Sequence, residues 1–159
     1  MIEIFWSELH SGFPDTAQLV RVIIRLVSAM LMGGMIGMQR EKAGKPAGLR
    51  THILVAMGTT LFVLAATGSG MNPDGVSRVI QGVASGIGFL GAGAILKLSV
   101  AKEIKGLTTA AGIWMTAAIG VTVGLGELGL ALLGTILTWT VLASLEWFEK
   151  NEPAKEDAK

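Results

Sequence analysis

Few side chains in this sequence have the types and spacing that chemistry requires. The chain has no cysteine and two histidines, His10 and His52, neither of which has a partner at metal-ligand spacing. A thiolate nucleophile, a disulfide and a cysteine-based metal site are therefore excluded, and each histidine is interpreted as a polar flank of an apolar run. A nucleophile, a base and an orienting group cannot be assembled from one charged loop. We expect no enzyme activity, no catalytic residue, no cofactor and no metal site.

The richest polar segment is the stretch 39–52, which joins two long apolar runs. Its candidate functional residues are Arg40, Glu41, Arg50 and Thr51. A segment that only orients the protein in the membrane and attracts anionic lipids needs a few basic residues and nothing more. The alternative is a site in which Arg40, Glu41 and Arg50 pair with one another or bind an anionic group. Both interpretations stay open.

Other ionisable residues lie in or beside the apolar runs. Arg25 lies about one and a half turns into the first run, one turn after Arg21 and on the same face. An ionisable residue inside a membrane span is a functional candidate by default, although arginine at this depth can also extend to the interface. Asp74 and Arg78 are four residues apart and can bridge if a helix starts early, but an exposed pair contributes little.

These side chains must be positioned by regular secondary structure, and the composition predicts that this structure consists of membrane-spanning helices. The 159 residues are 51% hydrophobic and 16% charged, with a mean hydropathy of +0.60. A span needs about 17–25 mostly apolar residues. We predict an all-α, polytopic helix bundle with five spans: Leu19–Met38, Ile53–Gly70, Val79–Leu96, Leu107–Gly126 and Leu128–Phe148. Little more than Glu127 separates the last two, so they form a tight hairpin or are partly re-entrant, and a four-span alternative stays open.

The distribution of charge predicts the orientation of these spans. Ten of the 13 lysines and arginines lie in segments 39–52, 97–106 and 150–159, which an odd number of spans places on one side. Since cytoplasmic loops carry this excess, the N-terminus is expected outside and the C-terminus inside. We expect an extracytoplasmic segment (1–18) without a signal peptide, a transmembrane domain (19–148) and a short disordered cytoplasmic tail (149–159). A net charge of +1 gives no reason to expect nucleic acid.

Glycine organises the predicted spans, because small residues let helices approach closely in lipid. The glycines assigned to helix packing are Gly33, Gly37, Gly82, Gly112, Gly120 and Gly124. The last three belong to a stripe with Thr108 and Thr116 at every fourth position. That stripe turns only about 40° per step, so it predicts one helix contact.

The segment from Ser85 to Gly93 is denser in glycine than packing alone requires. Its candidate functional residues are Ser85, Gly86, Gly88, Gly91 and Gly93. Each glycine weakens a helix by about 1 kcal/mol relative to alanine. The segment is therefore either a regular helix in a crowded bundle or an unwound stretch whose carbonyls face a cavity, as in transporters.

Four blocks of this sequence resemble the MgtC/SapB family in order and spacing, over about residues 19–145. They are GGMIGMQRE (33–41), AGLRT (47–51), SGIGFLGAG (85–93) and GLTTAA (106–111), the last of which contains the candidates Thr108 and Thr109. The resemblance implies a multi-pass bacterial inner-membrane protein with a cytoplasmic C-terminus. Many members continue into a soluble C-terminal regulatory domain, whereas only the short segment 149–159 follows Phe148 here.

The resemblance also frames two hypotheses of function. Family members are associated with adaptation to low magnesium, stress and virulence, and the best-known look like regulators of other membrane proteins, including the F-type ATP synthase. The first hypothesis is a non-enzymatic regulator that docks its small-residue helix faces on a membrane partner. The alternative is a small transporter or channel for an ion or metabolite, related to Mg²⁺. A homo-oligomer in the lipid bilayer suits either, because so small a chain offers few helices to enclose a pathway.

Overall fold

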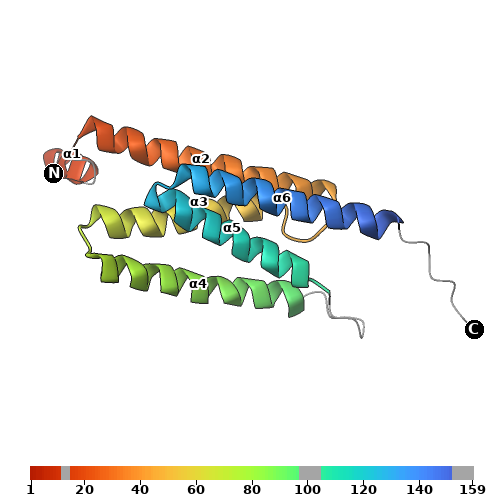
Figure 1. The fold of residues 1–159 in the computed structure, drawn as a ribbon. Helices are drawn as coiled ribbons and strands as arrows, with labels where there is room; N and C mark the ends of the chain where they lie inside the picture. Colours follow the sequence, from red (N-terminus) through yellow and green to blue (C-terminus); the bar gives the residue numbers. More distant parts are fainter. Residues whose placement is uncertain (12–14, 97–104, 152–159) are drawn as a thin grey trace, which may run out of the picture.

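The computed structural model describes residues 1–11, 15–96 and 105–151, and every regular element in these ranges is an α-helix (Figure 1). The helices are α1 (Ile2–Ser11), α2 (Thr16–Lys42), α3 (Leu49–Gly68), α4 (Pro73–Leu96), α5 (Leu107–Leu125) and α6 (Leu128–Asn151). The predicted all-α bundle is confirmed. The basic residues Lys97 and Lys102, and the tail residues 152–159, lie outside the described ranges.

Each of the five predicted spans is a helix. In the described part of the chain, α2 to α5 are long and apolar enough to cross a membrane, and Leu128–Ser144 within α6 is a shorter apolar helix. Residues 149–151, assigned to the tail, still belong to α6. The expected tight hairpin between α5 and α6 is present and depends on Gly126, whose φ of 94° favours glycine.

The N-terminal segment contains a helix that was not predicted. Helix α1 lies across the axis of the bundle, at the end where α2 begins (Figure 1). Its apolar residues Ile2, Phe5 and Trp6 recur at helical spacing on one face and are all exposed. This pattern is typical of a helix that lies in the plane of a membrane interface.

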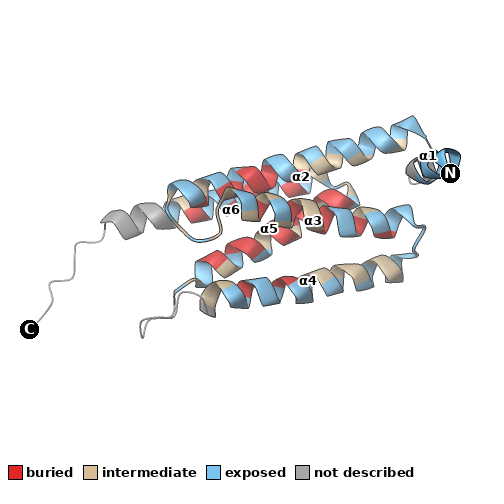
Figure 2. Cartoon of the chain, turned by 180° about the vertical axis from the view of Figure 1, so that it is seen from behind, coloured by how far each residue is buried: buried red, intermediate tan, exposed pale blue. Residues whose placement is uncertain are grey.

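Helix α5 is the centre of the bundle and contacts α2, α3, α4 and α6. Buried residues gather where α2, α3 and α5 face one another, whereas α4 is largely exposed (Figure 2). In the described part of the chain α4 packs only on α3 and α5. One side of α4 therefore has none of the described helices against it.

Glycine explains how closely α2, α3 and α5 pack. A Cβ atom added to Gly33 would lie 2.6 Å from the carbonyl oxygen of His52 and 2.9 Å from the Cβ of Ala56. Gly37 is equally tight, with Leu49 Cα 2.7 Å away, and Gly120 and Gly124 press against α3 in the same way. At these positions the backbones approach more closely than any side chain permits.

The glycines of α4 behave differently. The helix is continuous from Pro73 to Leu96, so the alternative of an unwound segment between Ser85 and Gly93 is wrong. Gly82 was expected at a helix contact, but an added Cβ would meet nothing within 4 Å, because α4 turns this face away from α3 and α5. Of the segment's glycines, Gly91 alone packs on another helix, with its added Cβ 3.5 Å from the Cβ of Ala110.

Candidate functional site

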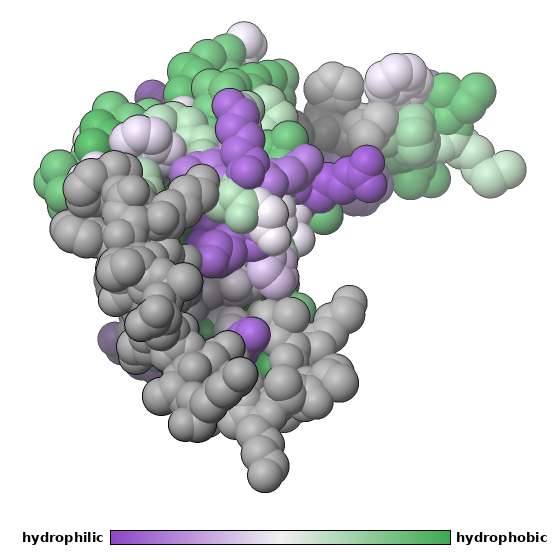
Figure 3. Space-filling view, turned by 90° about the vertical axis from the view of Figure 1, so that its right-hand side faces the viewer, coloured by the Kyte–Doolittle hydropathy of each residue, from purple (hydrophilic) through white to green (hydrophobic). Residues whose placement is uncertain are grey.

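A buried polar cluster lies at the end of the bundle where α2 ends and where α3 and α5 begin. Figure 3 shows this end, with hydrophilic side chains gathered among apolar ones. Arg40, on the last turn of α2, is only 4% exposed, and its Nη2 donates a hydrogen bond of 2.9 Å to Oγ1 of Thr109. Thr109 is buried as well, at 3% exposure. This bond ties the end of α2 to the start of α5.

Glu41 holds the start of α3. Its Oε2 accepts a hydrogen bond of 2.8 Å from the backbone N–H of Leu49. The N-cap residue, Gly48, has no side chain with which to cap the helix, and a Cβ there would lie 2.8 Å from the same Oε2. A carboxylate at a helix N-terminus satisfies a free N–H and complements the helix dipole. Glycine at 48 and glutamate at 41 therefore act together.

Pairing of Arg40, Glu41 and Arg50 with one another, one of the alternatives left open for segment 39–52, is not seen among the described residues. Arg40 and Glu41 contact different helices, and Arg50 is exposed with no hydrogen bond or ion pair to a described residue. Thr51 is half-buried at the start of α3. Arg40 and Glu41 therefore position helices, the first from a buried and the second from an exposed position, whereas Arg50 faces the surroundings.

His52 is buried, and its interpretation as a polar flank is wrong. It is 1% exposed, its Nδ1 lies 3.0 Å from the carbonyl oxygen of Gly48, and its Nε2 is buried with no hydrogen-bond partner among the described residues. Nε2 faces Gly112 of α5, where an added Cβ would lie 3.7 Å away. The signal that could have revealed this burial is the spacing of His52 with Ala56 and Val63, which lie on the same buried face of α3.

Arg25 marks the opposite end of the same helix pair. Its Nη1 donates a hydrogen bond of 2.8 Å to the carbonyl oxygen of Gly124, on the last turn of α5. The guanidinium also lies beside Gly126, at the turn into α6. A cation at a helix C-terminus satisfies a free carbonyl and complements the dipole. Arg25 therefore caps α5.

The two arginine contacts share one register. The separation between Arg25 and Arg40 along α2 equals the separation between their partners, Thr109 and Gly124, along α5. The helices run antiparallel, so equal spacing lets α2 hold α5 at both ends. Between these ends, Thr60 of α3 donates a hydrogen bond of 2.8 Å to the carbonyl oxygen of Gly120, a contact that the sequence did not reveal.

The remaining candidate residues are not brought to this cluster. Asp74 and Arg78 are exposed on α4, and although the helix starts early enough, no ion pair joins them. Ser85, Gly86, Gly88 and Gly93 are exposed on the same helix. All six residues lie on the outside of the bundle.

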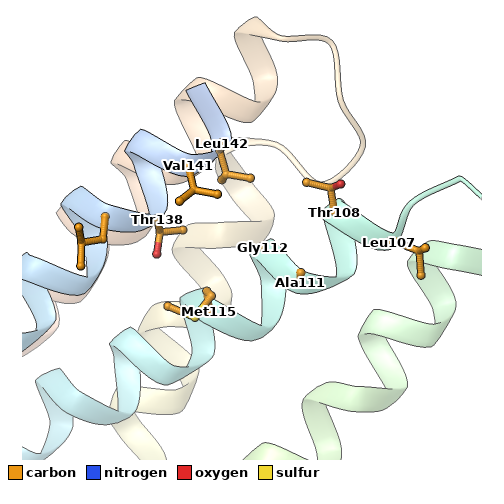
Figure 4. Close-up of a pocket in the computed structure, with 9 residues that line it drawn as sticks. Leu107, Thr108, Ala111, Gly112, Met115, Thr138, Val141 and Leu142 are labelled. Carbon is orange, nitrogen blue, oxygen red and sulfur yellow. The ribbon is translucent and has the colours of Figure 1, made fainter. Parts of the chain in front are cut away.

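A third feature is a cavity between α5 and α6 with a volume of about 530 Å³. Figure 4 shows Thr108 and Gly112 of α5 facing Thr138 and Leu142 of α6 across it. The hydroxyl of Thr138 already donates to the carbonyl oxygen of Gly134, at 2.7 Å. Of the stripe of small residues on α5, Thr108 is exposed at one end, whereas the other four members are buried: Gly112, Thr116, Gly120 and Gly124.

Long apolar helices tied together by Arg25 and Arg40 define a multi-pass α-helical membrane protein. The sequence profile of the MgtC family matches residues 26–151. The chain belongs to the MgtC family. No solved structure matches it.

Three relatives illustrate the similarity. SrpB of Synechococcus elongatus is 44% identical over 137 residues, covering 79% of this chain and 75% of that protein. YhiD of Escherichia coli K12, named "Putative magnesium transporter YhiD", is 45% identical over 130 residues, or 76% of this chain and 58% of that protein. MgtC of Salmonella typhimurium LT2 is 44% identical over 115 residues, or 72% of this chain. The match spans 48% of that MgtC, about half of its length.

Proposed function

We propose that this protein is a non-enzymatic regulator that docks the exposed face of α4 on another membrane protein. The observation that carries the proposal is the state of three glycines, Gly82, Gly86 and Gly93. A Cβ added to any of them would meet no atom of a described residue within 4 Å. Their spacing places all three within about 40° of one another around the helix.

No contact with another described residue requires glycine at these positions. Each one weakens the helix by about 1 kcal/mol relative to alanine. In α2 and α5 that cost is offset by backbone approach to α3, but α4 has no helix against this face. Phe89, 82% exposed, lies among the three glycines. A small-residue face beside an aromatic side chain suits a second helix that approaches from the lipid.

The proposal includes the orientation of the protein in its membrane, the conditions in which it acts and the class of its partner. The excess of lysine and arginine supports a cytoplasmic location for the Arg40 end of the bundle and the C-terminus. This orientation and the bacterial relatives support a location in a bacterial inner membrane. The low-magnesium association of the family and the name of the E. coli relative support a role under magnesium limitation. The partner classes are an ion transporter and the F-type ATP synthase.

The test fills the α4 face in the intact chain. Gly86→Leu adds a bulky side chain to that face, and Gly129→Leu is the matched control, because Gly129 is an exposed glycine of α6 with nothing within 4 Å of an added Cβ. We expect the Gly86→Leu protein to lose a copurifying membrane protein and to fail to support growth in low magnesium. We expect the Gly129→Leu protein to retain the copurifying protein and to support growth as the wild type does. Loss in both variants, or in neither, contradicts the proposal.

A second function, transport of Mg²⁺ by an oligomer of this chain, is favoured by the name of the E. coli relative. Reconstituted vesicles loaded with a magnesium-sensitive dye separate the two functions. Influx above that of empty vesicles supports transport. A regulator gives no influx on its own and keeps its copurifying partner.

A further inference from the structure

A small cavity with mixed polar and apolar walls lies at the Arg25 end of the bundle, between the first turns of α2 and the last turn of α3. Its volume is about 200 Å³. Its polar walls are formed by Gln18, Arg21 and Arg25 of α2 and by Thr67 of α3. The cavity is smaller than the pockets of about 300–1,000 Å³ that hold drug-sized ligands, so it suits a small group.

The α2 wall concentrates positive charge and hydrogen-bond donors. Gln18, Arg21 and Arg25 are three and four residues apart, which places them on one face of the helix. The arginine side chains carry two positive charges, and the Gln18 amide adds further donors. This wall therefore presents donors to one small volume.

No carboxylate of the described residues forms an ion pair with Arg21 or Arg25. The hydrogen bond of Arg25 goes to the carbonyl oxygen of Gly124, and Arg21 makes none with a described residue. The acidic residue nearest to these arginines along the chain is Asp15, the N-cap of α2. Its side chain accepts a hydrogen bond from the backbone N–H of Gln18. The hydroxyl of Thr67 already donates to the carbonyl oxygen of Val63, at 3.0 Å.

The position of the cavity along α2 indicates which anions reach it. The 27 residues of α2 extend about 40 Å, which exceeds the hydrocarbon core of about 30 Å, so the helix ends reach into the headgroup layers. Arg21 lies five residues after the start of α2, or about 7.5 Å along the axis. Long arginine side chains at this depth meet the phosphate groups of lipids.

We propose that this cavity binds a phosphate group between Arg21 and Arg25, with Gln18 as an additional donor. Guanidinium groups match phosphate oxygens in paired hydrogen bonds, which makes two neighbouring arginines a phosphate site. The phosphate comes from an anionic phospholipid headgroup in the same leaflet or from dissolved phosphate. All three side chains precede the residues that match the MgtC family, and the site is independent of docking by α4.

The test removes one charge without disturbing a helix contact. Arg21→Gln is the variant of choice, because Arg21 bonds to no described residue, whereas Arg25 also caps α5. Arg78→Gln is the matched control, since Arg78 is an exposed arginine that does not line the cavity. Native mass spectrometry measures retention of phosphatidylglycerol against phosphatidylcholine by the full chain, and calorimetry in detergent measures binding of inorganic phosphate.

We expect Arg21→Gln to weaken binding by about tenfold or more, as for the loss of a hydrogen bond to a charged group, and Arg78→Gln to leave it unchanged. Phosphatidylglycerol retention without binding of inorganic phosphate identifies the lipid headgroup as the source. Binding of both supports a site that accepts phosphate from either source. Equal loss in Arg21→Gln and Arg78→Gln, or no phosphatidylglycerol preference and no phosphate binding in the wild type, overturns the proposal.

Discussion

Replacing Gly33 by alanine should force α2 and α3 apart, whereas the same change at Gly34 should not. The Cβ of alanine at 33 would lie 2.6 Å from the carbonyl oxygen of His52 and 2.9 Å from the Cβ of Ala56. At 34 it would meet only the side chains of Ile53 and Leu49, at 3.7 and 3.8 Å. Since carbon atoms pack at about 3.5–4.0 Å, the second contact is ordinary and the first is not.

The size of the effect follows from comparing the two variants. Alanine favours the helix over glycine by about 1 kcal/mol at either position, so that gain cancels in the difference. Overpacking a tight interface costs about 1–3 kcal/mol. We therefore expect the free energy of unfolding of Gly33→Ala to be about 1–3 kcal/mol below that of Gly34→Ala. Gly34→Ala itself should be at least as stable as the wild type.

The assay is reversible unfolding in mixed micelles by increasing fractions of sodium dodecyl sulfate, followed by far-ultraviolet circular dichroism. Equal stability of the two variants, or a less stable Gly34→Ala, would refute the close approach of α2 and α3 at Gly33.

Three further predictions concern the polar contacts of the bundle. Thr109→Val removes the buried hydroxyl that accepts from Arg40 and should lower the unfolding free energy by about 1.5–3 kcal/mol in the same titration, whereas Thr108→Val, at an exposed site, should not. Glu41→Gln removes the charge that caps α3 and should speed hydrogen exchange in its first turn, with no change in the middle of that helix. Arg25→Gln should speed exchange in the residues just before the turn from α5 to α6, and unchanged exchange there would contradict the cap.

The helices themselves were predictable, because an apolar run of about 20 residues has few alternatives to a helix in lipid. The stripe on α5 was also predictable, since glycine and threonine at every fourth residue lie close together on a helix. Both features depend only on spacing along one segment.

The contacts between segments were less predictable. Hydropathy does not distinguish the inner face of a membrane helix from the outer one, because both are apolar, so Gly82 was placed at a contact that α4 does not make. The burial of His52 depends on the space that Gly112 leaves on α5, a helix far along the chain from α3. The equal spacing of Arg25 and Arg40 on α2 and of their partners on α5 could not be used as a prediction, because it requires knowing that α2 and α5 are antiparallel neighbours.

The central claim, that the α4 face docks on another membrane protein, is tested most directly by crosslinking in native membranes. The chain has no cysteine, so Gly86→Cys and the control Gly129→Cys can each carry a single cysteine-reactive photocrosslinker. We predict that the crosslinker at position 86 yields a covalent complex with one other membrane protein, and that the crosslinker at position 129 does not. Purification of that other protein should in turn recover this chain. Adducts with lipid or with a second copy alone at position 86, or the same protein adduct at both positions, would contradict the claim.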